Sequence, residues 1–181
     1  MPAKFKISFF QPLSLLDLVV YNNRKSSINR LSEVKFDYIY LTNYQHPEKI
    51  SICFFLSEVL MKLINFQIHD SKSFFFLRKS LLEFDKLEEN FENFHLQFLI
   101  KLSKYLGFEI TNVSNFSNIK LEKKEVILFL NKIIKSNYSS HIKTTSLIRN
   151  KALDIIIVYF REKSEIMMNL NSISVLHKIF N

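Results

Sequence analysis

A chain of 181 residues that is 48% apolar and 14% aromatic can bury a sizeable core, so its composition excludes wholesale disorder. Its single cysteine excludes an internal disulfide and a cysteine-rich zinc site. The net charge of +8 would attract nucleic acid or anionic surfaces, although abundant Lys and Asn beside a single Gly also fit the codon usage of an AT-rich genome. The N-terminal segment lacks the pattern of a signal peptide, and the longest apolar run, 153–160, is far shorter than a membrane span. We therefore predict a cytoplasmic protein without a membrane segment.

The first 45 residues show the alternation of apolar and polar side chains that is typical of β-strands. The alternation covers 4–9 and 33–40, and a β-rich stretch, LSLLDLVVY, follows Pro12. These patterns predict three strands with loops at 11–12 and 22–27. Three strands with polar outer faces leave open sheet edges, so we expect this part of the chain to need a partner.

From residue 46 onward the apolar spacing changes to that of amphipathic helices. It predicts six helices that begin at or near Pro47, Ser71, Phe91, Val126, Ser146 and Ser172. The third should end at Gly107, because glycine adopts the left-handed conformation at a helix C-terminus without a Cβ penalty. The second half of the fifth is apolar almost all round, so this helix is expected to lie centrally, and Ser172 is expected to be an N-cap. The predicted fold class is α+β, with a partial OB-fold-like sheet over 1–45 and a larger all-α domain over 46–181.

The side chains that carry out catalysis or hold metals show no recognised spacing. The five histidines form no HxH or HExxH pattern, and a single glycine cannot build a phosphate-binding loop. His95 falls on an apolar helix stripe, where we expect a hydrogen-bonded structural histidine, and Cys53 falls on the buried side of the first helix. Glu88, Glu89 and Glu92 stand at the start of a predicted helix, whose dipole favours carboxylates there. We predict that the protein is not an enzyme and has neither metal nor cofactor.

Two sets of basic residues could bind a polyanion. The first lies on or between the predicted strands, near Phe10, Tyr38 and Tyr40, and consists of Lys4, Lys6, Arg24, Lys25, Arg30 and Lys35. Such an arrangement suits single-stranded DNA, because cations follow the phosphates while rings stack on the bases. The second lies in 101–151, where ten basic residues face three acids, and its candidates are Lys101, Lys104, Lys120, Lys123, Lys124, Lys132 and Lys135. For the first set the alternative is solvated lysines and core aromatics, and for the second it is a solvated helix face.

Several stretches resemble the bacterial DNA repair protein family RecO in order and spacing. FQPLSLLDLVVY at 10–21, followed by INRLSEVKF, is similar to the later strands of the family's N-terminal OB-fold. ISICFFLSEVLMKLI at 50–64 is similar to the first helix of its helical domain, and FENFHLQFLIKLSKYLGF to its most recognisable helix. LDIIIVYFR and NLNSISVLHKIF resemble its C-terminal helices. Many members insert a four-cysteine zinc module after the Leu-Gly-aromatic sequence, whereas this chain has EITNVSNFSN, so the resemblance implies the zinc-free type.

The resemblance implies a recombination mediator. RecO proteins bind single- and double-stranded DNA, anneal complementary strands, and act with RecR to load RecA onto DNA coated by single-strand-binding protein. It therefore implies DNA, RecR and the acidic, apolar-ended tail of single-strand-binding protein as partners, and an association with the nucleoid. A groove for that tail is expected in the basic part of the helical domain.

The resemblance begins part-way through the family's OB-fold. Such a fold has about five strands, so roughly 50 residues that would carry its early strands are missing. Either the start lies upstream, or this is a reduced form whose open sheet edge takes a partner such as RecR. Two other functional hypotheses stay open. One is an interaction scaffold that binds RecR or the tail without annealing DNA, and the other is an eroding gene product.

Overall fold

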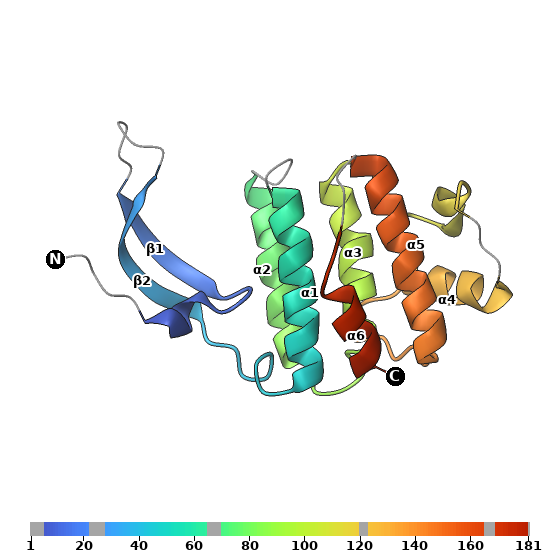
Figure 1. Ribbon diagram of the computed structural model, residues 1–181, viewed down its shortest axis with the longest axis horizontal. Coiled ribbons are helices and arrows are strands. Elements are labelled where there is room, and N and C mark those ends of the chain that lie inside the picture. The colour runs from blue at the N-terminus through green and yellow to red at the C-terminus, as the bar shows by residue number, and fades with distance from the viewer. Residues whose placement is uncertain (1–5, 22–27, 65–69, 120–122, 165–168, 181) are drawn as a thin grey trace.

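The computed structural model describes residues 6–21, 28–64, 70–119, 123–164 and 169–180. A β-hairpin projects from one side of a body of six α-helices (Figure 1). The fold is therefore α+β, with the sheet before the helices, as the sequence predicted.

The projecting part, which we call the arm, is built on the antiparallel strands β1 (Leu15–Tyr21) and β2 (Arg30–Tyr38). Bulges interrupt the pairing near each end. Within the described residues these two strands are the whole sheet. Leu18, Val19 and Val20 of β1 are 41%, 49% and 46% exposed, so the arm carries apolar side chains in solvent.

The prediction of the first of the three strands is wrong. Ile7–Phe10 form a 3-10 turn, η1, and the residues before Lys6 lie outside the described part of the chain. The ring of Phe9 stacks on Phe36 of β2, with centroids 4.7 Å apart. The segment thus packs on the face of the hairpin instead of pairing along its edge, a choice that apolar alternation cannot reveal.

The helices of the body stand side by side around one apolar core (Figure 1). They are α1 (Pro47–Ile64), α2 (Ser71–Lys86), α3 (Phe94–Tyr105), α4 (Lys124–Ile134), α5 (Ser146–Ser164) and α6 (Ile173–Ile179), with a 3-10 turn, η2 (Val113–Phe116), before α4. The most central is α3, in which every residue from Phe94 to Ile100 is buried. The fifth helix, predicted to be central, buries one side and exposes Asp154 and 161–163 on the other.

Gly107 ends α3 as predicted. Its φ is +83°, in the left-handed region, and its N–H donates to Lys104 O at 3.3 Å. The N–H of Phe108 donates to Ser103 O at 3.1 Å, so the last carbonyls of the helix are satisfied in a Schellman-type turn.

The start of α3 differs from the prediction. The helix begins at Phe94, and no acidic residue lies in its first turn. Glu88, Glu89 and Glu92 therefore lie in the connection from α2, and their assignment to a helix N-terminus is wrong. The N-cap residue, Asn93, makes no side-chain cap because its side chain is bonded elsewhere.

The C-terminal helix docks on α1 through a carboxylate. Ser172 precedes α6 as predicted but makes no side-chain cap; its N–H and its hydroxyl both donate to Glu58 of α1. Beside this contact, the ring of His95 lies near Phe55 and stacks on Phe180. Burial lowers the pKa of His95 to about 3, so the ring is neutral. Its Nδ1 has no hydrogen-bond partner within the described chain, so the predicted bond is missing at that atom.

A buried carboxylate, Asp85 at the end of α2, joins the arm to the body. It accepts the backbone N–H groups of Leu41, Thr42 and Asn43 at 2.8, 2.8 and 3.0 Å, and Tyr38 donates its hydroxyl at 3.2 Å. Burial by itself raises the pKa of Asp85, but the three amides outweigh it and hold the pKa below its ordinary value. The segment that follows β2 is thereby tied to α2.

Lys49 of α1 lies fully buried beneath the same junction. Its Nζ donates to Phe84 O at 2.9 Å and to Thr42 Oγ1 at 2.5 Å. The ammonium also lies 4.9 Å from the ring centroid of Phe84 and 5.3 Å from that of Phe91. Burial lowers the pKa of Lys49, and the charge of Asp85 opposes that shift.

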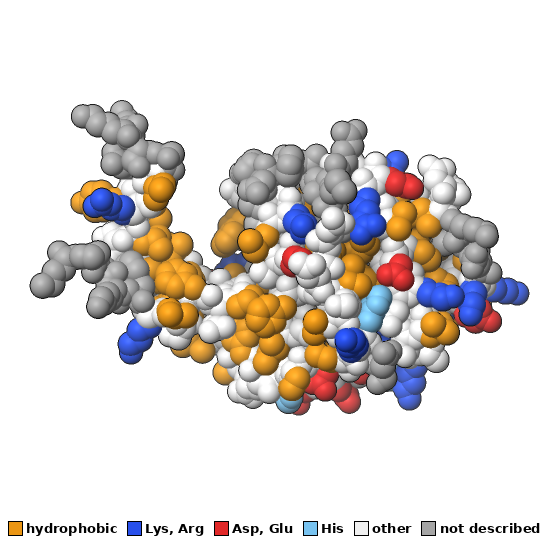
Figure 2. All heavy atoms as spheres, viewed as in Figure 1, with side chains coloured by type: hydrophobic (Ala, Val, Ile, Leu, Met, Phe, Trp, Pro, Cys, Tyr) orange, Lys and Arg blue, Asp and Glu red, His pale blue; other side chains and the backbone are white. Residues whose placement is uncertain are grey.

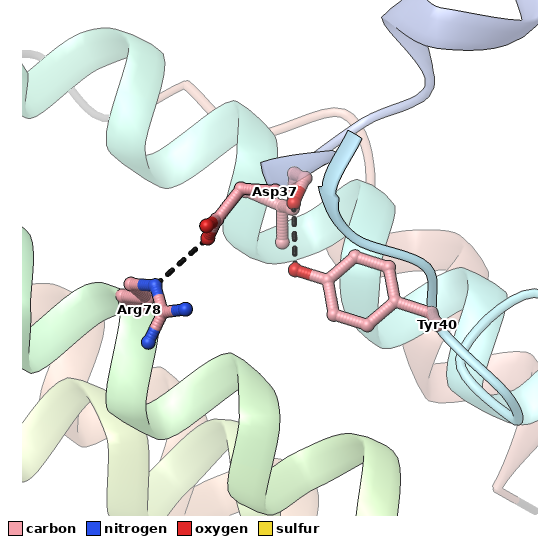
Figure 3. A network of polar contacts seen from close by, with 4 residues as sticks. Asp37, Tyr40 and Arg78 are labelled. Atoms are coloured by element: carbon pink, nitrogen blue, oxygen red, sulfur yellow. Dashed lines mark hydrogen bonds and ion pairs between the residues drawn. The ribbon is translucent and has the colours of Figure 1, made fainter. Parts of the chain in front are cut away.

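An outer contact ties β2 to α2 a second time. Arg78 Nε donates to Asp37 Oδ2 at 2.8 Å, and nearby the hydroxyl of Tyr40 donates to Leu13 O at 2.8 Å (Figure 3). The side chains of the ion pair are 36% and 38% exposed. Water screens such a pair, so we expect it to stabilise the junction less than Asp85 does.

We expect Asp85→Asn to lower the free energy of unfolding by roughly 2–4 kcal/mol, because one amide oxygen replaces a charged carboxylate that accepts three amides. Urea unfolding followed by circular dichroism measures the change. The matched control is Asp37→Asn, which breaks the exposed ion pair and should cost far less. An equal loss in the two variants would contradict the role assigned to Asp85.

The lowered pKa of Asp85 also predicts a pH effect. The folded protein binds this proton less readily than the unfolded chain, so the stabilisation is complete above the unfolded pKa of about 3.9 and is lost as the pH falls below it. Between about pH 5 and pH 3 the melting temperature of the wild type should therefore fall more steeply than that of Asp85→Asn.

Candidate nucleic-acid interface

The basic residues predicted on the arm are exposed where the structure describes them. Those described are Lys6, Arg30 and Lys35; those outside the described residues are Lys4, Arg24 and Lys25. Lys35 Nζ lies 3.0 Å from Asp17 Oδ2 across the hairpin. This hydrogen bond, with the charge of Asp17, raises the pKa of Lys35. The described part of the arm thus exposes cations, and one of them, Lys35, forms an ion pair with Asp17.

The tyrosines that the sequence suggested for base stacking lie at the junction instead. The rings of Tyr38 and Tyr40 are half-buried and pack edge to face, with centroids 5.6 Å apart. Tyr40 packs in the same way on Tyr44, at 5.4 Å. Phe10, by contrast, is 48% exposed. The geometry favours the alternative in which the tyrosines serve packing.

The second predicted set divides between two environments. Lys104 is exposed, with Nζ 4.0 Å from Glu109, whereas Lys101 is half-buried. Four exposed members line up along the start and the outer side of α4: Lys123, Lys124, Lys132 and Lys135. Lys120 lies outside the described residues.

A groove of about 900 Å³ lies between α2, α3 and the turn at 137–139. We call it the α2–α3 groove. Four lysines and four aromatic residues contribute to its lining: Lys72, Lys79, Lys86, Lys101, Phe75, Phe76, Tyr105 and Tyr138. Its acidic member is Glu83, which lies 3.9 Å from Lys79 Nζ. A groove that combines cations with rings can hold a single nucleic-acid strand or an acidic peptide with apolar side chains.

The floor of the groove is packed and hydrogen-bonded, and its rim is exposed. Phe76 stacks on Tyr105 with centroids 4.5 Å apart, and Ser80 is hydrogen-bonded to Tyr138 at 2.9 Å. Burial raises the pKa of Tyr138, which keeps its hydroxyl protonated. Phe75 on the rim is 65% exposed, so its ring is free to meet a base.

Lys101 has a structural role in this floor. Its Nζ donates to Ser136 O at 3.1 Å and lies 5.4 Å from the ring centroid of Tyr138. Burial lowers its pKa. It therefore holds the turn at 137–139 against α3 and forms a fixed positive wall.

Sequence reasoning missed the three α2 lysines of the groove. Lys72, Lys79 and Lys86 are seven residues apart, which places them on one helix face. That spacing could have predicted a basic helix face. It was overlooked because the segment 51–100 has more acidic than basic residues and so a negative net charge.

A second, apolar hollow lies between α1 and α6. It has a volume of about 630 Å³, and Ile50, Phe54, Val175 and Ile179 contribute to its lining. Hydrophobic side chains gather over these two helices on the face shown in Figure 2. Among the described residues that line it, Glu58 is the one with a charge, so the hollow does not suit an acidic ligand.

The described ranges contain neither a candidate metal cluster nor a candidate membrane span. They contain no group of three or more His, Cys, Asp or Glu side chains arranged to hold a metal ion. No helix in them is both long and apolar enough to cross a bilayer.

Comparison with known proteins gives consistent matches. The family model "Recombination protein O C terminal" matches residues 44–118. The protein named DNA repair protein RecO in Phocaeicola vulgatus is 30% identical over 97% of this chain and 81% of its own length. The chain belongs to the RecO family. The RecO proteins of Azobacteroides pseudotrichonymphae and Flavobacterium johnsoniae are 27% and 34% identical, over 96% and 71% of this chain and 80% and 53% of their own lengths. No solved structure matches the chain.

Membership of the RecO family confirms the resemblance found in the sequence. The names of these relatives describe DNA repair and no catalysed reaction, in agreement with the prediction that the chain is not an enzyme. The family model covers α1, α2, α3 and η2, and thus includes the α2 side and the α3 side of the groove.

We expect Lys101→Met to lower the free energy of unfolding by about 1–2 kcal/mol, because it removes the bond to Ser136 and the ammonium over Tyr138. Lys104→Met, three residues along the same helix, is the control and should change stability much less, since its side chain is solvated. Thermal and urea unfolding compare the two. If both variants match the wild type, Lys101 is a surface cation and the wall of the groove is not fixed.

Proposed function

We propose that this RecO-family protein is a recombination mediator. It binds single- and double-stranded DNA, anneals complementary strands, and helps RecR to load RecA onto DNA coated by single-strand-binding protein. It acts in the cytoplasm, at the nucleoid, without a cofactor. Membership of a family whose relatives are named for DNA repair supports the general role.

The α2–α3 groove is the observation that carries the DNA-binding part of this proposal. A strand along it would meet the row of Lys72, Lys79 and Lys86 on one side and Lys101 on the other. Phe75, exposed on the rim, would stack on a base. The lysines contact phosphates and the ring contacts a base face, so binding would be independent of sequence, as annealing requires.

The arm extends this surface. Lys6, Arg30 and Lys35 add exposed cations on a hairpin that projects from the body. The strand β1 carries a single charge, Asp17, and exposes Leu18, Val19 and Val20, whereas β2 carries several charges. A strand edge without protecting charges is suited to pairing with another strand, so we assign RecR contact to β1.

The second candidate function is an interaction scaffold. The same groove combines lysines with half-buried rings, which is the chemistry that would bind the acidic, apolar-ended tail of single-strand-binding protein. In this role the protein binds the tail or RecR and does not anneal DNA. The two functions differ in DNA affinity and in its dependence on salt.

The deciding experiment compares two triple variants in fluorescence anisotropy of a labelled single-stranded oligonucleotide, titrated over salt. Changing Lys72, Lys79 and Lys86 to Ala should weaken binding of all sequences and flatten the salt slope by about two units, because three phosphate contacts are lost. Phe75→Ala should cost roughly 1–3 kcal/mol of binding without changing the slope, because stacking releases no counterions.

The matched control changes Lys124, Lys132 and Lys135 on α4, which removes the same charge from the face that the sequence favoured. If this variant loses more affinity than the α2 variant, DNA follows α4 and the groove is not its path. If wild-type protein binds DNA no better than an unrelated basic protein but still binds an acidic tail peptide, the scaffold function holds.

A further inference from the structure

A small polar pocket lies where α3 and α5 begin, separate from the α2–α3 groove. Its volume is about 270 Å³, and its lining includes Glu92, Asn93, His141, Lys143 and Arg149. One water needs only about 10–15 Å³ of such volume, so a small oxyanion with some of its water fits.

The pocket contains a largely buried arginine. Arg149 is only 8% exposed, its Nε donates to Asn93 Oδ1 at 3.0 Å, and its guanidinium lies 5.5 Å from the ring centroid of Phe180. Within the described residues no carboxylate forms an ion pair with it, and its hydrogen bond to Asn93 uses Nε, one of its three nitrogens. A guanidinium fork matches two oxygens of an oxyanion, so the terminal nitrogens that Asn93 does not engage can donate to one.

The surroundings favour an anion. Asn93 precedes α3 but does not cap it, because its side chain is engaged by Arg149 and donates to Ile142 O at 2.7 Å. The positive end of the α3 dipole therefore faces this region without a side-chain cap. Lys143 adds an exposed cation, and Glu92 is the acid of the lining. Burial lowers the pKa of Arg149 and Glu92 opposes that shift, so the guanidinium stays charged.

We propose that this pocket binds a phosphate group through Arg149 and Lys143. The group is either free phosphate or the terminal phosphate of a DNA strand, since both present the same oxygens. Binding of free phosphate requires no DNA site, so the inference stands apart from the proposed function.

The test is the melting temperature of the full chain with sodium phosphate, against sodium chloride of equal ionic strength. Near saturation the wild type should melt roughly 5 °C higher in phosphate. Arg149→Met should lose this shift in melting temperature. Lys143→Ala should need at least tenfold more phosphate to reach half of it. Glu92→Gln should reach half of the shift at a lower phosphate concentration than the wild type, because it removes a negative charge that repels phosphate. Lys132→Ala, an exposed lysine on α4, is the control and should behave as wild type.

The outcomes separate the proposal from its alternatives. A wild-type shift no larger than in chloride, or an equal shift in Arg149→Met, would overturn it. If Arg149→Met does not fold, the opposite effects of Lys143→Ala and Glu92→Gln still decide. An oligonucleotide with a 5′-phosphate that stabilises the protein at lower concentration than its 5′-hydroxyl twin identifies a DNA end as the source, and equal behaviour identifies free phosphate. The α2 triple variant should keep the full phosphate response whether or not it binds DNA.

Discussion

The arrangement of this protein depends on one buried carboxylate. Asp85 collects three backbone amides from the segment after β2, and Lys49 lies beneath it with its ammonium against backbone carbonyls and two rings. Backbone amides compensate the carboxylate and backbone carbonyls compensate the ammonium, and the charge of Asp85 also opposes the lowering of the Lys49 pKa. The position of the arm relative to the body, and so of its cations relative to the groove, follows from this junction.

The central helix α3 connects the two binding surfaces that we propose. Its first residue follows Asn93, which holds Arg149 in the polar pocket, and its later turns supply Lys101 and Tyr105 to the groove. Because seven consecutive residues of α3 are buried, the helix cannot shift without disturbing the core. Both surfaces are therefore built on a rigid element, as binding sites require.

The basic residues of the chain lie in different environments and have different roles. Lys49 and Arg149 are buried, Lys101 is half-buried, and Lys35 is shared with Asp17. Among the exposed cations, three form a row on α2 and others line α4, while further ones lie on the arm and elsewhere on the body. The net charge of +8 thus overstates what a polyanion would meet, and the choice between the two rows depends on the rings that accompany the α2 row.

Local pattern alone determined the α+β class, the six helices and the end of α3 at Gly107, because apolar periodicity and glycine conformation are properties of neighbouring residues. The resemblance to RecO came from particular stretches in their order along the chain. Local pattern failed at η1, where Phe9 packs on a strand more than twenty residues away. The groove, the Asp85 junction and the burial of Arg149 beside Asn93 were decided by tertiary structure. Each brings together side chains from separate helices or from both parts of the molecule, and sequence spacing does not record which of these meet.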